Sequence, residues 1–163
     1  MTIYKVPIER RSKPCRFRNL TDLEIRIICN GCGVKGGWFK PPDYRFKASC
    51  DQHDFNWWLG GNKQDLKRSD RAFLKAMLHD AKYTRCGTLR PWWRRCWYKG
   101  AAYRYYWAVI ARQSDVGVTL FGKGGFNFHA PENQDQQWSR LERYMDANGA
   151  EPDEALWNKE DWE

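Results

Sequence analysis

A break of three residues, Gly60-Gly61-Asn62, separates two segments that both have the periodicity of a helix. One face of the first segment, residues 48–59, carries side chains at i, i+3, i+4 and i+7: Cys50, His53, Asp54 and Trp57. An inner stripe of the second segment, residues 65–83, carries Leu66, Asp70, Phe73, Leu74 and Met77. Because so short a connection favours antiparallel neighbours, we predict a pair of helices that fold back on each other.

An acidic and a basic residue on opposite sides of the break are spaced so that their side chains could meet in a catalytic site. His53 lies eight residues before Gly61 and Asp70 lies nine residues after it, so antiparallel helices would bring the two to the same level. A buried carboxylate needs a partner, and His53 is well placed to be that partner. One ring nitrogen would donate to Asp70, which would leave the other as an acceptor that can take a proton from water.

A metal ligand and a glycine-rich loop accompany this pair. Asp54 follows His53 directly and offers a hard oxygen ligand, and the loop of residues 30–37 can offer backbone carbonyls. Carboxylate and carbonyl oxygens suit Ca²⁺. A calcium ion beside a base and a water molecule makes a site for ester hydrolysis, since the metal polarises the carbonyl and stabilises the oxyanion.

Three motifs together resemble the phospholipase A2 superfamily, and most closely its compact prokaryotic and fungal branch: Gly31-Cys32-Gly33, Cys50-Asp51-Gln52-His53-Asp54-Phe55 and Asp70-Arg71-Ala72-Phe73. The resemblance covers about residues 30–77. It implies an enzyme that hydrolyses the sn-2 ester of glycerophospholipids, with His53 and Asp70 as catalytic residues and Ca²⁺ bound by Asp54 and by loop carbonyls at Gly31 and Gly33. It also implies a disulfide between Cys32 and Cys50. The sequence departs from the family at Trp57, where a tyrosine is common, and in the spacing of the calcium loop.

The main alternative is a structural zinc site. Cys29-x-x-Cys32 and Cys50-x-x-His53 form a Cys₃His set with plausible spacing, which would suit a zinc-stabilised basic module that binds nucleic acid or a protein. A third interpretation is that the histidine and the aspartates form a structural cluster without catalysis.

The charge of the chain favours anionic partners. Its formal net charge is +8 and its pI is near 9.3, which suits nucleic acid or an acidic lipid surface. Residues 92–107 are rich in aromatics and cations, and they could form core with cation–π packing, an interfacial membrane surface or a stacking surface for single strands. No known nucleic-acid motif is present, so we rank nucleic acid last and expect an anionic phospholipid surface.

The remaining sequence predicts a mainly α protein with a phospholipase A2-like helix pair after a calcium loop. We expect a basic, extended N-terminal arm over residues 1–20, a domain over 21–130 and an acidic tail over 131–163. Thr21 and Glu24 have capping-box spacing, a third, aromatic helix is expected over 92–112, a short strand over 116–121 and a tail helix over 137–145.

The N-terminus lacks the apolar segment of a secretory signal, and no apolar run reaches the roughly 20 residues that span a bilayer. We therefore expect a hydrolase that reaches lipid by another route, as an injected effector or as part of a viral particle.

Overall fold

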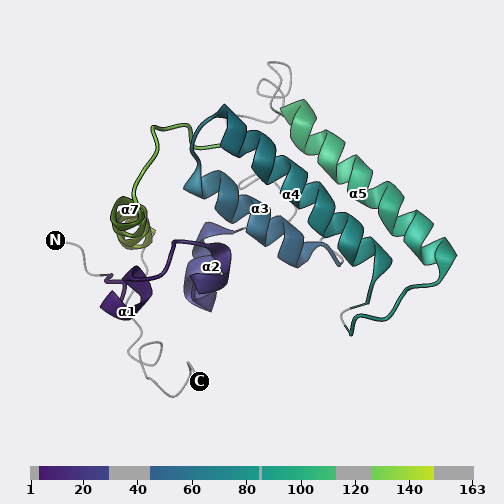
Figure 1. Cartoon of the computed structure of the whole chain (residues 1–163), viewed down its shortest axis with the longest axis horizontal. Helices are drawn as coiled ribbons and strands as arrows, with labels where there is room; N and C mark the ends of the chain where they lie inside the picture. Colours follow the sequence, from purple (N-terminus) through teal and green to yellow (C-terminus); the bar gives the residue numbers. More distant parts are fainter. Residues whose placement is uncertain (1–3, 30–44, 85, 113–125, 149–163) are drawn as a thin grey trace. The chain divides into compact units, whose positions relative to one another are not determined.

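The computed structural model describes residues 4–29, 45–84, 86–112 and 126–148 (Figure 1). It is mainly α, which confirms the predicted fold class. The helices are α1 (Ile8–Arg11), the 3₁₀ helix η1 (Phe17–Asn19), α2 (Asp22–Ile28), α3 (Lys47–Leu59), α4 (Lys63–Lys82), α5 (Trp92–Arg112) and α7 (Gln134–Ala147). Within the described ranges, β structure is limited to isolated bridges, Gly61 with Phe128 and Tyr83 with Leu89. The expected strand over 116–121 lies outside those ranges.

The chain divides into two compact units, Ile28–Pro131 and a second unit that combines Met1–Ile27 with Glu132–Glu163. Each unit has buried residues of its own. No helix within the described residues is both long enough and apolar enough to cross a membrane.

Helices α3 and α4 form the predicted pair, running side by side in opposite directions with only three residues between them (Figure 1). The start of α4 is fixed by a capping box in which the Asn62 side chain accepts from the backbone N–H groups of Gln64 and Asp65 at 2.7 and 3.1 Å. The Asp65 carboxylate accepts in turn from the Asn62 N–H at 3.0 Å. Such reciprocal bonds satisfy donors that a helix start leaves unpaired.

The turn between the two helices requires glycine at its first position. Gly60 has φ of +72° and ψ of −152°, a combination adopted almost only by glycine. A Cβ on Gly60 would lie 1.9 Å from the carbonyl oxygen of Asn127. This close approach follows from hydrogen bonds of the backbone: the Gly61 N–H donates to Asn127 O at 3.0 Å, and the Asn127 N–H donates to Trp57 O at 3.1 Å.

Helix α5 has two chemically different faces. Its inner face contributes the buried Ala102, with partly buried tyrosines and Val109, to a cluster that also holds Phe46, Cys50, Phe73 and Met77. Its outer face exposes four tryptophans by between 56% and 74%: Trp92, Trp93, Trp97 and Trp107. Of the three interpretations of this stretch, core packing applies to the tyrosines that contact this cluster and does not apply to these tryptophans or to Tyr103, which is 38% exposed.

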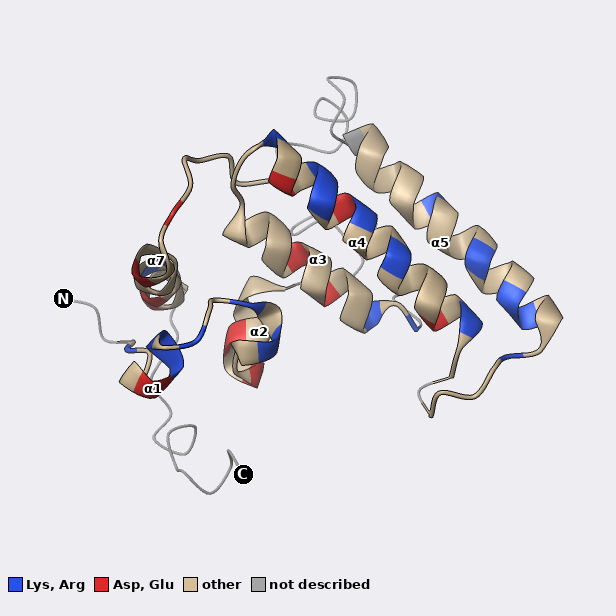
Figure 2. Ribbon diagram, viewed as in Figure 1, with Lys and Arg blue, Asp and Glu red and all other residues tan. Residues whose placement is uncertain are grey.

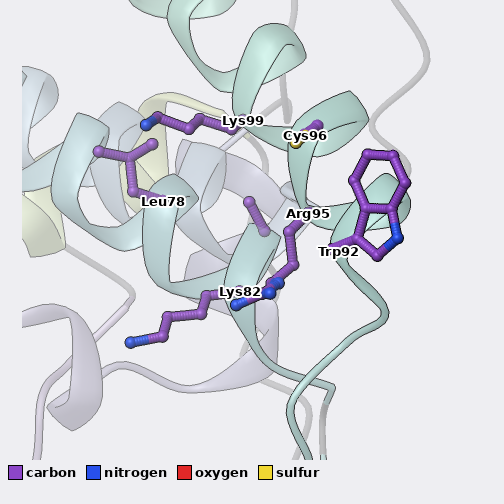
Figure 3. A pocket seen from close by; sticks show the side chains of 7 residues that line it. Leu78, Lys82, Trp92, Arg95, Cys96 and Lys99 are labelled. Atoms are coloured by element: carbon purple, nitrogen blue, oxygen red, sulfur yellow. The ribbon is translucent and has the colours of Figure 1, made fainter.

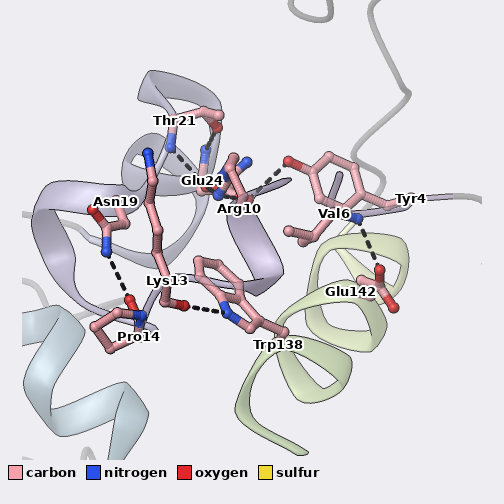
Figure 4. A network of polar contacts seen from close by, with 10 residues as sticks. All are labelled: Tyr4, Val6, Arg10, Lys13, Pro14, Asn19, Thr21, Glu24, Trp138 and Glu142. Atoms are coloured by element: carbon pink, nitrogen blue, oxygen red, sulfur yellow. Dashed lines mark hydrogen bonds and ion pairs between the residues drawn. The ribbon is translucent and has the colours of Figure 1, made fainter. Parts of the chain in front are cut away.

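Residues of the expected N-terminal arm form part of the second unit (Figure 4). The extended arm over 1–20 is therefore a wrong prediction, because the segment contains α1 and η1 and buries Tyr4, Val6, Cys15 and Leu20. These apolar positions are too scattered along the sequence to show a period. They are covered with the help of α7, whose buried side chains include Trp138, Leu141 and Met145.

The second unit contains a buried ion pair between Arg10 and Glu24. Arg10 contacts both carboxylate oxygens of the fully buried Glu24, at 2.9 and 2.6 Å, and the Tyr4 hydroxyl donates to the same carboxylate at 3.0 Å. The predicted capping box is present, since the Thr21 N–H donates to Glu24 and the Glu24 N–H donates to Thr21 Oγ1. Burial and the neighbouring Glu24 carboxylate raise the pKa of the Tyr4 phenol, so it remains a donor.

Candidate functional site

The structure brings His53 and Asp70 together. Asp70 Oδ1 on α4 lies 3.0 Å from His53 Nε2 on α3, and both residues are buried, with exposed fractions of 2% and 6%. The contact follows from the register of the helix pair, in which His53 stands about two turns before the Gly60-Gly61 break and Asp70 about two and a half turns after it. The two side chains therefore meet at the level that their sequence positions predict.

The pairing assigns a proton to one ring nitrogen. An ionised carboxylate can only accept hydrogen bonds, so His53 Nε2 carries the proton and donates it to Asp70. In this tautomer the lone pair is on Nδ1. The ring is also held by aromatic neighbours, since it stacks on Phe73 at 4.4 Å between centroids and lies 4.8 Å from the Trp57 ring. Packing and hydrogen bonding together fix the direction of Nδ1.

Trp57 occupies the position at which the resembling family often has a tyrosine. Its indole Nε1 donates to Asp70 Oδ1 at 3.1 Å, so the same oxygen accepts from both Trp57 and His53. The indole thus supplies the one kind of hydrogen bond of which it is capable. Two donors on one oxygen satisfy the buried carboxylate and help to orient it.

Asp54, the predicted metal ligand, is half-buried on α3 beside His53. Burial raises the pKa of the nearby Cys29 thiol to about 12, and the negative charges of Asp54 and Asp51 add to this shift. The Cys29 thiol also donates to the backbone carbonyl of Asp51 at 3.1 Å. Of these two carboxylates, Asp51 is paired with Lys47 Nζ at 2.6 Å.

The remaining predicted calcium ligands, Gly31 and Gly33, lie outside the described residues. The donor set they would form with Asp54, one carboxylate and backbone carbonyls, has the chemistry that Ca²⁺ prefers. No group of three or more His, Cys, Asp or Glu side chains is placed to hold a metal ion in the part of the chain that the structure describes. That part includes Cys29, Cys50 and His53 but excludes Cys32, the fourth member of the zinc set.

The predicted disulfide between Cys32 and Cys50 stays a prediction. Cys50 is buried on α3 and is not among the free cysteines of the described residues, which are Cys15, Cys29, Cys86 and Cys96. Cys32 lies outside the described residues.

A residue far along the sequence completes the surroundings of the site. Phe126 is buried and packs edge-on against the Trp57 ring, with 6.4 Å between centroids. Sequence reasoning missed this contact because 69 positions separate the two residues and no local period links them. His129 lies at the end of α3, with Nε2 at 2.8 Å from the carbonyl oxygen of Leu59.

Comparisons with models of known protein families, with curated proteins and with solved structures give no match to this chain.

Proposed function

We propose that this protein is a phospholipase A2-type enzyme that hydrolyses the sn-2 ester of glycerophospholipids in a calcium-dependent reaction. The observation that carries the proposal is the buried pair of His53 and Asp70, 3.0 Å apart on antiparallel helices, with Asp54 next to the histidine in sequence. An imidazole whose tautomer and orientation are fixed by a carboxylate is well suited to general-base catalysis.

The residues of the pair have distinct roles in the proposed reaction. His53 Nδ1 takes a proton from a water molecule as the water oxygen bonds to the ester carbonyl carbon. Asp70 stabilises the imidazolium that forms, and the tetrahedral intermediate then collapses with cleavage of the bond to the glycerol oxygen. The imidazolium returns its proton to that leaving oxygen, which restores neutral His53. Calcium, held by Asp54 and by the carbonyls of Gly31 and Gly33, would stabilise the negative charge on the carbonyl oxygen.

Helix α5 supports an anionic phospholipid surface as the partner. Figure 2 shows Lys and Arg along the helix, and its sequence contains no Asp or Glu but five cations: Arg94, Arg95, Lys99, Arg104 and Arg112. The exposed tryptophans lie on the same helix, and Arg94 stacks over the Trp93 ring at 4.9 Å. Amphipathic aromatic rings beside cations suit the headgroup region of a bilayer.

Release of fatty acid from anionic glycerophospholipid vesicles tests the proposal, in calcium and in excess chelator. We expect calcium-dependent release by the wild type and a loss of about 10²- to 10⁴-fold in rate for His53→Gln, since general-base catalysis contributes about that much. His79→Gln is the matched control, because His79 is an exposed histidine on α4. Wild-type protein that releases no fatty acid in calcium, or His53→Gln with unchanged activity, would overturn the assignment.

Asp54→Asn tests the metal separately. We expect this variant to lose calcium binding in a calorimetric titration while keeping its helical circular dichroism signal, because an asparagine of nearly the same size replaces a half-buried aspartate. Wild-type calcium affinity in Asp54→Asn would place the ligand elsewhere.

Metal analysis and mass spectrometry of the unreduced protein distinguish the zinc alternative. A peptide that crosslinks Cys32 to Cys50 would support the hydrolase, because a disulfide sulfur is not a thiolate ligand. One zinc ion per chain with free Cys29, Cys32 and Cys50 would overturn it, since the zinc would occupy the lone pair that His53 needs as a base.

A further inference from the structure

A pocket of about 310 Å³ lies between the C-terminal part of α4 and the N-terminal part of α5 (Figure 3). Three cations line it, Lys82 from α4 and Arg95 and Lys99 from α5, together with Trp92 and Leu78. Lys82 follows Asp70 by twelve positions on the same helix, a separation of about 18 Å at the helical rise of about 1.5 Å per residue. The pocket is therefore distinct from the proposed hydrolytic site.

The cations of this pocket have no carboxylate partners in the described ranges. The ion pairs of that part of the chain involve other residues, and the nearest acid on α4, Asp80, accepts instead from the Ser49 hydroxyl at 2.8 Å. Arg95 Nε is buried and has no hydrogen-bond acceptor. A buried donor without an acceptor is destabilising, so the site is suited to a ligand that supplies one.

The position of the pocket adds to its preference for an anion. Arg95 and Lys99 belong to the first two turns of α5, a helix of 21 residues whose N-terminal end carries a partial positive charge. Trp92 and Leu78 give the pocket apolar walls beside the cations. In Figure 3 the Arg95 side chain extends from α5 toward the α4 side of the pocket.

We propose that this pocket binds a phosphate monoester group. Three cations suit the double negative charge of a phosphate monoester better than they suit the single charge of a carboxylate. A guanidinium can also donate two parallel hydrogen bonds to phosphate oxygens. A volume of about 310 Å³ suits a phosphate with a short organic substituent, which would contact the apolar walls. The group could belong to a soluble phosphate ester or to the headgroup of phosphatidic acid, and both share the chemistry that the pocket recognises.

Calorimetric titration of the full chain with inorganic phosphate and with glycerol 3-phosphate tests the proposal. We expect saturable binding at one site, which Arg95→Gln and Lys99→Gln each weaken about 10- to 100-fold, the loss typical of a hydrogen bond to a charged group. Lys99 is exposed, so its substitution leaves the packing intact even if Arg95→Gln perturbs the fold. Arg104→Gln is the matched control, because Arg104 is an exposed cation of α5 that does not line the pocket.

Vesicles that contain phosphatidic acid provide the lipid arm of the experiment. Binding to these vesicles that Lys99→Gln weakens more than Arg104→Gln does would assign the group to a lipid headgroup, whereas saturable binding of glycerol 3-phosphate would assign it to a soluble ester. The proposal is overturned if neither arm shows a loss on Lys99→Gln, or if Arg104→Gln has an equal effect, which would indicate diffuse charge. His53→Gln should leave binding unchanged, so this result is independent of the hydrolytic activity.

Discussion

Asp70→Asn is the substitution that most directly tests the proposed chemistry. The amide is nearly the same size as the carboxylate and keeps one oxygen that can accept from His53 Nε2 and Trp57 Nε1. It removes the negative charge that would stabilise His53 once the imidazole has taken a proton. The variant therefore separates the electrostatic role of Asp70 from its role in packing.

The distance in the structure sets the size of the effect. Two unit charges 3.0 Å apart interact with about 5 kcal/mol at an effective dielectric constant of about 20. A neutral hydrogen bond retains about half the strength of a charge-assisted one. The expected loss is thus about 3–5 kcal/mol of transition-state stabilisation, which corresponds to a fall of about 10²- to 10⁴-fold in kcat/KM.

Initial rates of calcium-dependent fatty acid release measure this effect, with a thermal unfolding curve for each variant. Asp80→Asn is the matched control, because Asp80 is also a carboxylate of α4 that accepts from α3, in this case from the Ser49 hydroxyl at 2.8 Å. We expect Asp80→Asn to retain activity within about threefold, since Asp80 contacts no residue of the proposed site.

A double-mutant cycle with His53→Gln gives a second check. Residues that act as a unit show strongly non-additive losses, so Asp70→Asn should reduce the activity of His53→Gln only slightly. Activity of the single variant Asp70→Asn within about twofold of the wild type, with intact folding, would refute the role of the pair.

Three further predictions concern stability and binding. Gly60→Ala should lower the free energy of unfolding by at least about 2 kcal/mol in denaturant titrations, because the strain at Gly60 adds to a Cβ contact of 1.9 Å; Gly87→Ala, at φ of +76° in open space, should cost only about 1–2 kcal/mol. Trp97→Ala should weaken binding to anionic vesicles in co-sedimentation without loss of stability, whereas Ile8→Ala, an exposed apolar residue of the other unit, should not; equal binding by both would show that α5 does not meet lipid. Burial and the Glu24 carboxylate raise the pKa of the Cys15 thiol to about 12, so its contribution to stability is complete below about pH 9 and is lost as the pH rises toward 12. The slope should be about 1.4 kcal/mol per pH unit in reducing buffer, and an equal slope in Cys15→Ala would contradict it.

The helix pair could be predicted from sequence because every signal for it is local. Spacings of three and four residues place His53 and Asp70 on their helices, and Gly60-Gly61-Asn62 ends one helix and caps the next. The level at which the two side chains meet follows from counting residues to the break. Local periodicity and turn chemistry therefore suffice for the part of the site that depends on α3 and α4.

The parts that sequence could not predict depend on contacts between distant segments. The arm expected over residues 1–20 is covered with the help of α7, and no period in the arm indicates this because its buried apolar residues are scattered outside its two short helices. In α5 aromatic residues occupy both faces, so the hydrophobic pattern does not reveal that Tyr98 and Tyr105 pack inward while Trp97 and Trp107 are exposed. Which face of such a helix is buried depends on the helices that pack against it.

The orientation of Asp70 illustrates how local and distant determinants combine. The helix pair alone brings the carboxylate to His53, but the second donor, Trp57 Nε1, depends on the indole being held in place. Phe126 packs against that indole, and the Asn127 N–H donates to the Trp57 carbonyl, so a segment 69 or more positions away buttresses the tryptophan from ring and backbone. The same segment approaches Gly60 so closely that a side chain there would displace it. The glycine of the turn thus serves the site as well as the fold, because it admits the segment that holds the donor to Asp70.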